Sequence, residues 1–267
     1  MIGIFDSGFG GLTVFKEIKR ALPQYNYIYL GDSLRAPYGD RSQEAIFNFT
    51  KEAVDYLFKQ GCLLVIIACN SASSKALRKL QQEYLPEHYP DRRLLGVIRP
   101  IVEEAVKVSK KGRIGVIGTK ATVEAKAYLR ELDQQKKGLE IFQNTCPLLV
   151  PLVEENVLNK PETRMIIKKY LRPLKEKKID TLILGCTHYP ILMKEISRII
   201  GKSVKVLDVA KIVAEKLADY LNRHPEIESL LKKNGQVQYL TTDNVERFAE
   251  LGSKFLGEKI VAEKIVL

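Results

Sequence analysis

Short, almost wholly apolar runs alternate with longer amphipathic stretches along most of this chain. The apolar runs predict strands at residues 2–5, 26–30, 63–68, 94–98, 113–117, 140–144, 181–184 and 203–207. Helical periodicity predicts helices near residues 11–21, 42–60, 72–84, 101–110, 121–134, 161–177, 191–200 and 209–221. Apolar strands that alternate with helices are typical of a parallel sheet covered on both faces. We therefore predict an α/β fold.

An internal repeat divides this pattern into two halves. The run Ile2-Gly-Ile-Phe-Asp-Ser-Gly8 resembles Ile114-Gly-Val-Ile-Gly-Thr119, 112 residues later. The run Leu63-Leu-Val-Ile-Ile-Ala-Cys69-Asn-Ser resembles Thr181-Leu-Ile-Leu-Gly-Cys186-Thr-His, with the two cysteines 117 residues apart. Chance similarity between apolar strands explains the strands, but it explains less well why a Cys and two hydrogen-bonding residues recur after them. We predict two similar parallel-sheet α/β domains related by pseudo-twofold symmetry, with the active site in the cleft between them.

The C-terminal part departs from the repeat. Residues 236–241 and 259–266 flank one short helical stretch, which predicts an added edge strand or a hairpin.

Composition narrows the class of protein. The longest apolar run, residues 62–69, is too short to span a bilayer, and the N-terminus lacks the pattern of a signal peptide. Four cysteines in 267 residues, with no Cys-x-x-Cys, indicate free thiols in a reducing cytoplasm. The net charge of +11 comes from lysines mixed with glutamates along helices. We interpret it as a solvated helix surface, or as a positive field that attracts a small dianionic substrate, and we predict neither membrane nor nucleic acid as a partner.

Two cysteines occupy the places where ligands bind in parallel sheets. Cys69 and Cys186 each end a strand and precede a helix, where N–H groups and the helix dipole favour a thiolate. Two thiols facing each other across a cleft suit a reaction that removes a proton from one face of a carbon and returns one to the other. The alternative is that both are core residues, since Cys is often buried. The polar pairs Asn-Ser and Thr-His that follow favour chemistry over packing.

The other candidate residues carry weaker signals. Cys62 and Cys146 are interpreted as packing residues, and no close ligand pair supports a zinc site. The Gly-rich segment 6–11 does not match a nucleotide-binding loop, although its glycines allow close approach of a small ligand. Asp6 is either a helix cap or a proton relay, and His188 gains a functional interpretation from its place two residues after Cys186.

Taken together, the motifs resemble those of glutamate racemases in the aspartate/glutamate racemase superfamily. Six segments occur in the family's order and span almost the whole chain. They are Gly3-Ile-Phe-Asp-Ser-Gly-Phe-Gly-Gly-Leu-Thr13, Tyr29-Leu-Gly-Asp-Ser-Leu-Arg-Ala-Pro-Tyr-Gly39, Ala68-Cys-Asn-Ser-Ala-Ser73, Ile114-Gly-Val-Ile-Gly-Thr119, Leu149-Val-Pro-Leu-Val-Glu154 and Leu182-Ile-Leu-Gly-Cys-Thr-His-Tyr-Pro190. The resemblance implies an isomerase that interconverts L- and D-glutamate without a cofactor or metal, and that supplies D-glutamate for peptidoglycan synthesis. It also implies a cytoplasmic homodimer.

The resemblance also implies roles for individual residues. Cys69 would act on D-glutamate and Cys186 on L-glutamate. Asp6 would assist Cys69, and His188 would assist Cys186 with support from Glu154. The residues implied in substrate binding are Asp6, Ser7, Tyr38, Gly39, Asn70, Ser71, Thr119, Thr122, Thr187 and His188. Hydroxyls and N–H groups at helix starts suit the two carboxylates of glutamate.

The family's domains interleave, which implies a first domain of residues 1–97 plus 208–267 and a second of residues 98–207. Three positions depart from the usual pattern: Ser71 stands where Thr is commoner, Arg99 where an acidic residue is frequent, and Asp208-Val-Ala210 where Asp-Ser-Gly or Asp-Ser-Ala is commoner. Arg99 bears on regulation or domain closure more than on chemistry. Two other functions stay open: another amino-acid racemase, such as an aspartate racemase, and a basic regulatory or DNA-binding protein on a racemase scaffold. A thiol hydrolase is a third alternative, but it would need only one Cys with a His, so the pair Cys69 and Cys186 argues against it.

Overall fold

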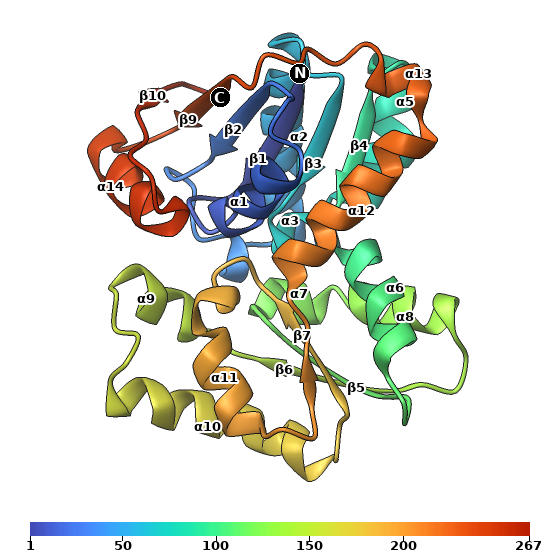
Figure 1. Ribbon diagram of the computed structural model, residues 1–267, viewed down its shortest axis with the longest axis vertical. Coiled ribbons are helices and arrows are strands. Elements are labelled where there is room, and N and C mark those ends of the chain that lie inside the picture. The colour runs from blue at the N-terminus through green and yellow to red at the C-terminus, as the bar shows by residue number, and fades with distance from the viewer.

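The computed structural model describes residues 1–267 and contains two parallel sheets with helices packed around each (Figure 1). The first sheet has six strands in the order β10-β9-β2-β1-β3-β4, and the second has four in the order β6-β5-β7-β8. The strands of the first are β1 (Ile2–Asp6), β2 (Tyr27–Gly31), β3 (Leu64–Ile67), β4 (Arg93–Gly96), β9 (Val237–Thr241) and β10 (Ala262–Lys264). Those of the second are β5 (Arg113–Gly118), β6 (Glu140–Thr145), β7 (Thr181–Gly185) and β8 (Lys205–Val206). The predicted α/β class with two parallel sheets is confirmed.

The two sheets share one strand order, which explains the internal repeat. β2-β1-β3-β4 in the first sheet corresponds to β6-β5-β7-β8 in the second. β1 pairs with β3 from Ile2 opposite Leu64, and β5 pairs with β7 from Ile114 opposite Thr181. The repeated runs are therefore β1 and β3 in the first sheet and β5 and β7 in the second, and the two cysteines follow corresponding strands.

Helices connect the strands of both sheets. They are α1 (Leu12–Ala21), α2 (Gln43–Lys59), α3 (Asn70–Lys75), α4 (Leu77–Lys79), α5 (Leu85–His88), α6 (Ile98–Val108), α7 (Lys120–Glu124), α8 (Ala127–Gln135), α9 (Leu149–Glu154), α10 (Pro161–Glu176), α11 (Met193–Ile200), α12 (Val209–Arg223), α13 (Pro225–Glu228) and α14 (Val245–Leu256). Two short 3-10 helices, η1 (Tyr38–Asp40) and η3 (Tyr189–Leu192), and one π-helix, η2 (Leu80–Tyr84), complete the elements.

Two predicted helices are divided in the structure. The stretch 72–84 is broken into α3, α4 and η2. The stretch 121–134 is interrupted at Lys126, whose φ of 54° lies in the left-handed region, so α7 and α8 run as separate helices. Helical periodicity does not mark either break.

The C-terminal segment adds two strands to one side of the first sheet, with β10 at the edge, and it does not form a hairpin. β9 pairs with β2 and β10 pairs with β9, both in parallel, because α14 crosses between them. The six-stranded sheet thus combines strands from residues 2–96 with strands from residues 237–264, while the four-stranded sheet lies within residues 113–206. The predicted domain boundaries at 97/98 and 207/208 stay a prediction.

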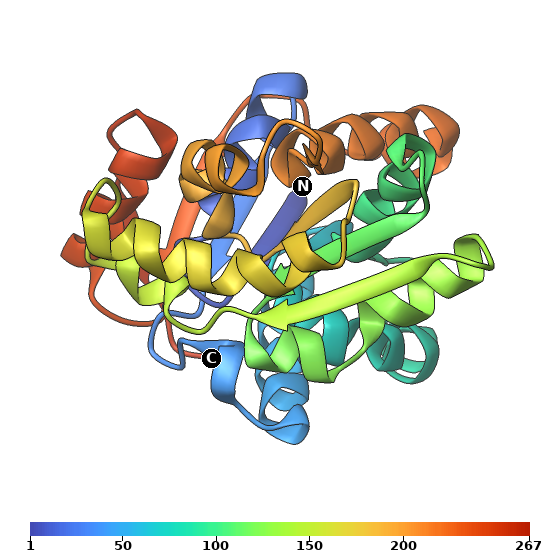
Figure 2. The same cartoon turned by 90° about the horizontal axis from the view of Figure 1, so that it is seen from below.

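One apolar cluster extends across both sheets. It joins Ile4 of the first sheet to Ile183 of the second and includes Leu217 of α12, which packs against α1 and α6. A second cluster, with Val65 and Leu57, fills the other side of the first sheet. Seen from below, α10 crosses in front of the four-stranded sheet, on the side away from the first sheet (Figure 2). None of the helices combines the length and the hydropathy that a membrane-spanning segment needs.

Candidate active site

Cys69 and Cys186 lie at the carboxyl ends of corresponding strands. Cys69 follows β3 and directly precedes α3, while Cys186 follows β7 and precedes η3. Both side chains are buried, with 5% and 6% of their surface exposed. Neither forms a disulfide, and neither do Cys62 and Cys146, which are fully buried.

Burial and negative charge keep Cys69 protonated. Its thiol donates to Ser7 Oγ at 3.5 Å. Desolvation, together with the charges of Asp6 and Cys186, raises the pKa of Cys69 to about 12. The N–H of Ala72, at the start of α3, lowers the pKa of this thiol as expected, but desolvation outweighs that effect.

Cys186 lies at the end of a chain of polar contacts. Its Sγ is 3.8 Å from Nδ1 of His188, and Nε2 of His188 is 3.1 Å from Oε1 of Glu154. Burial alone would lower the pKa of His188, but the hydrogen bonds to Cys186 and Glu154 raise it to about 10. An imidazole at this distance from sulfur is placed to exchange a proton with it. The two cysteines thus have different polar neighbours, Ser7 beside Cys69 and His188 beside Cys186.

Asp6 connects the two halves of the site. Its side chain is fully buried and accepts hydrogen bonds from the N–H of Gly8 at 3.1 Å and from the hydroxyl of Thr187 at 3.4 Å. Burial raises the pKa of Asp6, an effect that the charge of His188 and these hydrogen bonds oppose. Asp6 ends β1 in the first sheet, whereas Thr187 follows β7 in the second, so the contact spans the interface between the sheets.

Hydroxyl groups gather beside Cys69. Ser71 Oγ is 2.9 Å from Thr119 Oγ1, which is 3.1 Å from Thr122 Oγ1. Asn70, next to Cys69, accepts from the hydroxyl of Tyr128 at 2.7 Å. The structure therefore brings Ser71 and Asn70 from the first half against residues of the second.

The remaining predicted residues, Tyr38 and Gly39, lie in η1. The hydroxyl of Tyr38 donates to Asp32, and a Cβ on Gly39 would be 3.0 Å from the side chain of Thr119. Sequence reasoning gave no role to Asp32, which is fully buried and also binds Arg35 and Thr242. The signal for it was present, since Asp32 follows β2 at the same sheet edge as Asp6 and Cys69.

The comparisons with known proteins agree with this geometry. The family model described as Asp/Glu/Hydantoin racemase matches residues 2–217. The chain belongs to this racemase family. The glutamate racemase of Chlorobaculum tepidum is 40% identical over 267 residues, which cover 99% of this chain and 95% of that protein.

Solved structures of racemase-family members share the whole fold. Glutamate racemase isoform RacE1 from Bacillus anthracis superposes with a TM-score of 0.92 at 35% identity, covering 100% of this chain and 97% of that one. Glutamate racemase from Francisella tularensis, solved in complex with D-glutamate, gives a TM-score of 0.89 at 32% identity, covering 99% and 97%.

The positions that depart from the usual racemase-family pattern have structural explanations. Arg99 is exposed in the first turn of α6 and lies 3.4 Å from the carboxylate of Glu103. The carboxylate of Asp208 accepts from the N–H of Lys211 and caps α12. Neither residue contacts the thiols.

Proposed function

We propose that the chain is a glutamate racemase that moves protons between two thiols. The observation that carries this proposal is the pair of buried cysteines at the ends of corresponding strands, each with its own polar partners. Cys69 faces Ser7 and Asp6, and Cys186 faces His188. Membership of the racemase family and full-length similarity to glutamate racemases support the choice of substrate.

Each thiol would act as base in one direction and as acid in the other. With L-glutamate, the thiolate of Cys186 takes the α-proton, so that an S–H bond forms while the C–H bond breaks. The electron pair delocalises into the α-carboxylate, and Cys69 then gives its proton to the opposite face of the carbon. The reaction leaves a thiolate at Cys69, ready for D-glutamate. The contrasting surroundings of the two thiols suit a starting state with one thiolate and one thiol.

Neighbouring groups would hold the substrate. The hydroxyls of Ser71, Thr119 and Thr122 can rotate to donate to a carboxylate. The low exposure of both thiols excludes bulk water, which strengthens electrostatic stabilisation of the carbanion-like state. We further propose that the enzyme is a cytoplasmic homodimer that supplies D-glutamate for peptidoglycan synthesis.

Racemisation in heavy water tests the two-thiol scheme. A solvent-derived deuteron arrives from the second thiol, so early product should carry deuterium while recovered substrate stays protiated. Cys69→Ser and Cys186→Ser should each abolish racemisation, because a hydroxyl is a poor base near neutral pH. Cys62→Ala, which removes a buried thiol outside the site, is the matched control. Near-normal turnover by either serine variant, or equal labelling of substrate and product, would refute the scheme.

The assay should be run after dialysis against a chelator and without added cofactor. We expect full activity, since the two thiols supply both proton transfers. Recovery of lost activity on adding pyridoxal phosphate or a metal ion would contradict this. Faster racemisation of L-aspartate than of L-glutamate, followed by circular dichroism, would favour an aspartate racemase. Salt-sensitive retention on DNA without racemisation would favour the regulatory alternative.

A further inference from the structure

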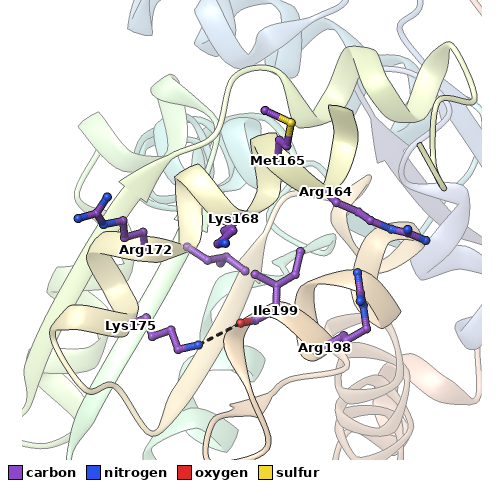
Figure 3. Close-up of a pocket in the computed structure, with 8 residues that line it drawn as sticks. Arg164, Met165, Lys168, Arg172, Lys175, Arg198 and Ile199 are labelled. Atoms are coloured by element: carbon purple, nitrogen blue, oxygen red, sulfur yellow. Dashed lines mark hydrogen bonds between the residues drawn. The ribbon is translucent and has the colours of Figure 1, made fainter. Parts of the chain in front are cut away.

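A basic hollow lies between α10 and α11, outside the thiol site. Its volume is about 440 Å³, and its cationic lining consists of Arg164, Lys168, Arg172, Lys175 and Arg198. Helix α10 forms one wall and α11 the other, with Arg164 and Arg198 at one end and Arg172 and Lys175 at the other (Figure 3). A volume of roughly 300–1,000 Å³ is typical of sites for small molecules.

The positive charges of the hollow are not balanced by its neighbours. Arg164 and Arg198 share a single carboxylate, that of Glu195, at 3.3 and 2.8 Å. Arg172 pairs with Glu176 at 2.8 Å. Lys168 has no carboxylate partner, and Lys175 only donates to the carbonyl of Ile199 at 3.5 Å. Five cations against two carboxylates leave an excess of three positive charges.

The spacing of the cations concentrates charge on one helix face. Residues 164, 168, 172 and 175 lie three or four positions apart, so they line a single side of α10. Residues 98–207 contain 22 Lys and Arg and 12 Asp and Glu, of the 43 and 32 in the whole chain. Nearly all the net charge of +11 therefore belongs to this part of the protein, and the hollow lies on its surface.

The hollow also offers an apolar surface. Ile199 lines it between the two charged ends, and Met165 is 71% exposed at its edge. Such a large exposed apolar side chain among cations provides a surface for the uncharged part of a ligand.

We propose that this hollow binds a small organic phosphate with at least two negative charges and an apolar or planar body. Two linked phosphate groups carry enough negative charge to neutralise the excess of three positive charges within one cavity. A carboxylate carries only one negative charge, so several carboxylates would have to be placed at separate points. The planar guanidinium groups of Arg164 and Arg198, held in place by Glu195, match the oxygens of a phosphate. Lys168 and Lys175 supply point charges, and Ile199 and Met165 contact the body.

Isothermal titration calorimetry with ADP, pyrophosphate and adenosine tests this proposal. ADP should bind more tightly than pyrophosphate, because its body covers the apolar surface, and adenosine should not bind measurably. Binding of ADP should weaken as salt increases. The double variant Lys168→Gln/Lys175→Gln should weaken ADP binding about tenfold or more, since it removes two charge-assisted contacts.

The matched control is Lys136→Gln/Lys137→Gln, which makes the same change of charge at exposed positions beyond the end of α8. This control should bind ADP like the unmodified chain, and both double variants should keep their racemase activity without ADP. Failure of both phosphates to bind, or equal weakening in the two double variants, would overturn the proposal. The proposal would also be overturned if the protein sedimented with phosphatidylglycerol vesicles but bound neither ADP nor pyrophosphate. That result would identify a lipid headgroup as the phosphate that the hollow binds.

Discussion

Asp6 is an ionisable side chain with no exposed surface, and its burial raises its pKa. A carboxyl group whose pKa is higher in the folded than in the unfolded chain stabilises the fold at low pH. That stability is fully present below the unfolded pKa of about 4, and it is lost as the pH rises through the folded pKa. At neutral pH an ionised Asp6 therefore lowers the free energy of unfolding. We interpret this loss of stability as the consequence of keeping a charged carboxylate beside Cys69.

We predict that Asp6→Asn raises the free energy of unfolding near neutral pH, because it replaces a buried carboxylate with a neutral amide of the same shape. The gain should disappear below about pH 4, where the unmodified carboxyl is protonated in both states. Urea unfolding across a pH series measures the difference. A gain that grows on acidification would show that Asp6 is stabilised as a carboxylate. Racemisation should fall in the same variant.

His188 touches Cys186 but not Cys69, so its loss should affect the two directions differently. We predict that His188→Ala lowers kcat by roughly 10²–10⁴-fold, with the larger loss when L-glutamate is the substrate. The two enantiomers have equal free energy, so kcat/KM must be equal for both. The ratio of the KM value for L-glutamate to that for D-glutamate must therefore equal the corresponding ratio of the two kcat values. Initial rates from each enantiomer measure this skew. Small and equal losses of kcat would make His188 a structural residue.

The turn between β1 and α1 packs directly against the turn after β7. A Cβ on Gly10 would be 2.4 Å from Cε1 of His188 and 2.6 Å from Oγ1 of Thr187, so no side chain fits there. Thr13 Oγ1 lies 2.8 Å from the carbonyl oxygen of Thr187 and strengthens the same contact. The Gly-rich segment, residues 6–11, thus allows the turn after β1 to pack closely against the turn after β7.

We predict that Gly10→Ala displaces His188 and lowers kcat by about 10²-fold, since a shift of about 1 Å at a catalytic group has effects of that size. The fold should survive, because the neighbouring strands keep their pairing. Steady-state kinetics measures the loss, and circular dichroism and the melting temperature serve as controls. Unchanged kcat in a folded variant would mean that the turn yields without moving His188.

The elements that the sequence predicted well are those with local causes. All eight predicted strands occur, because an apolar run between turn residues specifies a buried strand without reference to the rest of the chain. The breaks in 72–84 and at Lys126 depend on packing that no periodicity reports. The thiols could be singled out because they recur at equivalent places. The contacts of Asn70 with Tyr128 and of Ser71 with Thr119 could not be predicted from the sequence, because they depend on how the two sheets pack against each other.

At the scale of the whole molecule, the two sheets share one apolar core. Ile4, Ile183 and Leu217 belong to the same cluster, and α12 packs against helices of both halves. Separation of the sheets would expose this surface to water. We predict a single cooperative unfolding transition in differential scanning calorimetry, with equal calorimetric and van't Hoff enthalpies. Two resolved transitions would instead show that each half has enough core to fold independently.

The position of β9 between β2 and β10 also orders events during synthesis on the ribosome. Until residues 237–241 emerge, β2 has a free edge, and such an edge can pair with another chain. The strands of the four-stranded sheet all lie within residues 113–206, so that sheet can close while the first is still open. The four-stranded sheet can thus be completed before the six-stranded sheet, although β1 to β4 are synthesised first. A chaperone would protect the nascent chain best in the interval before β9 is synthesised.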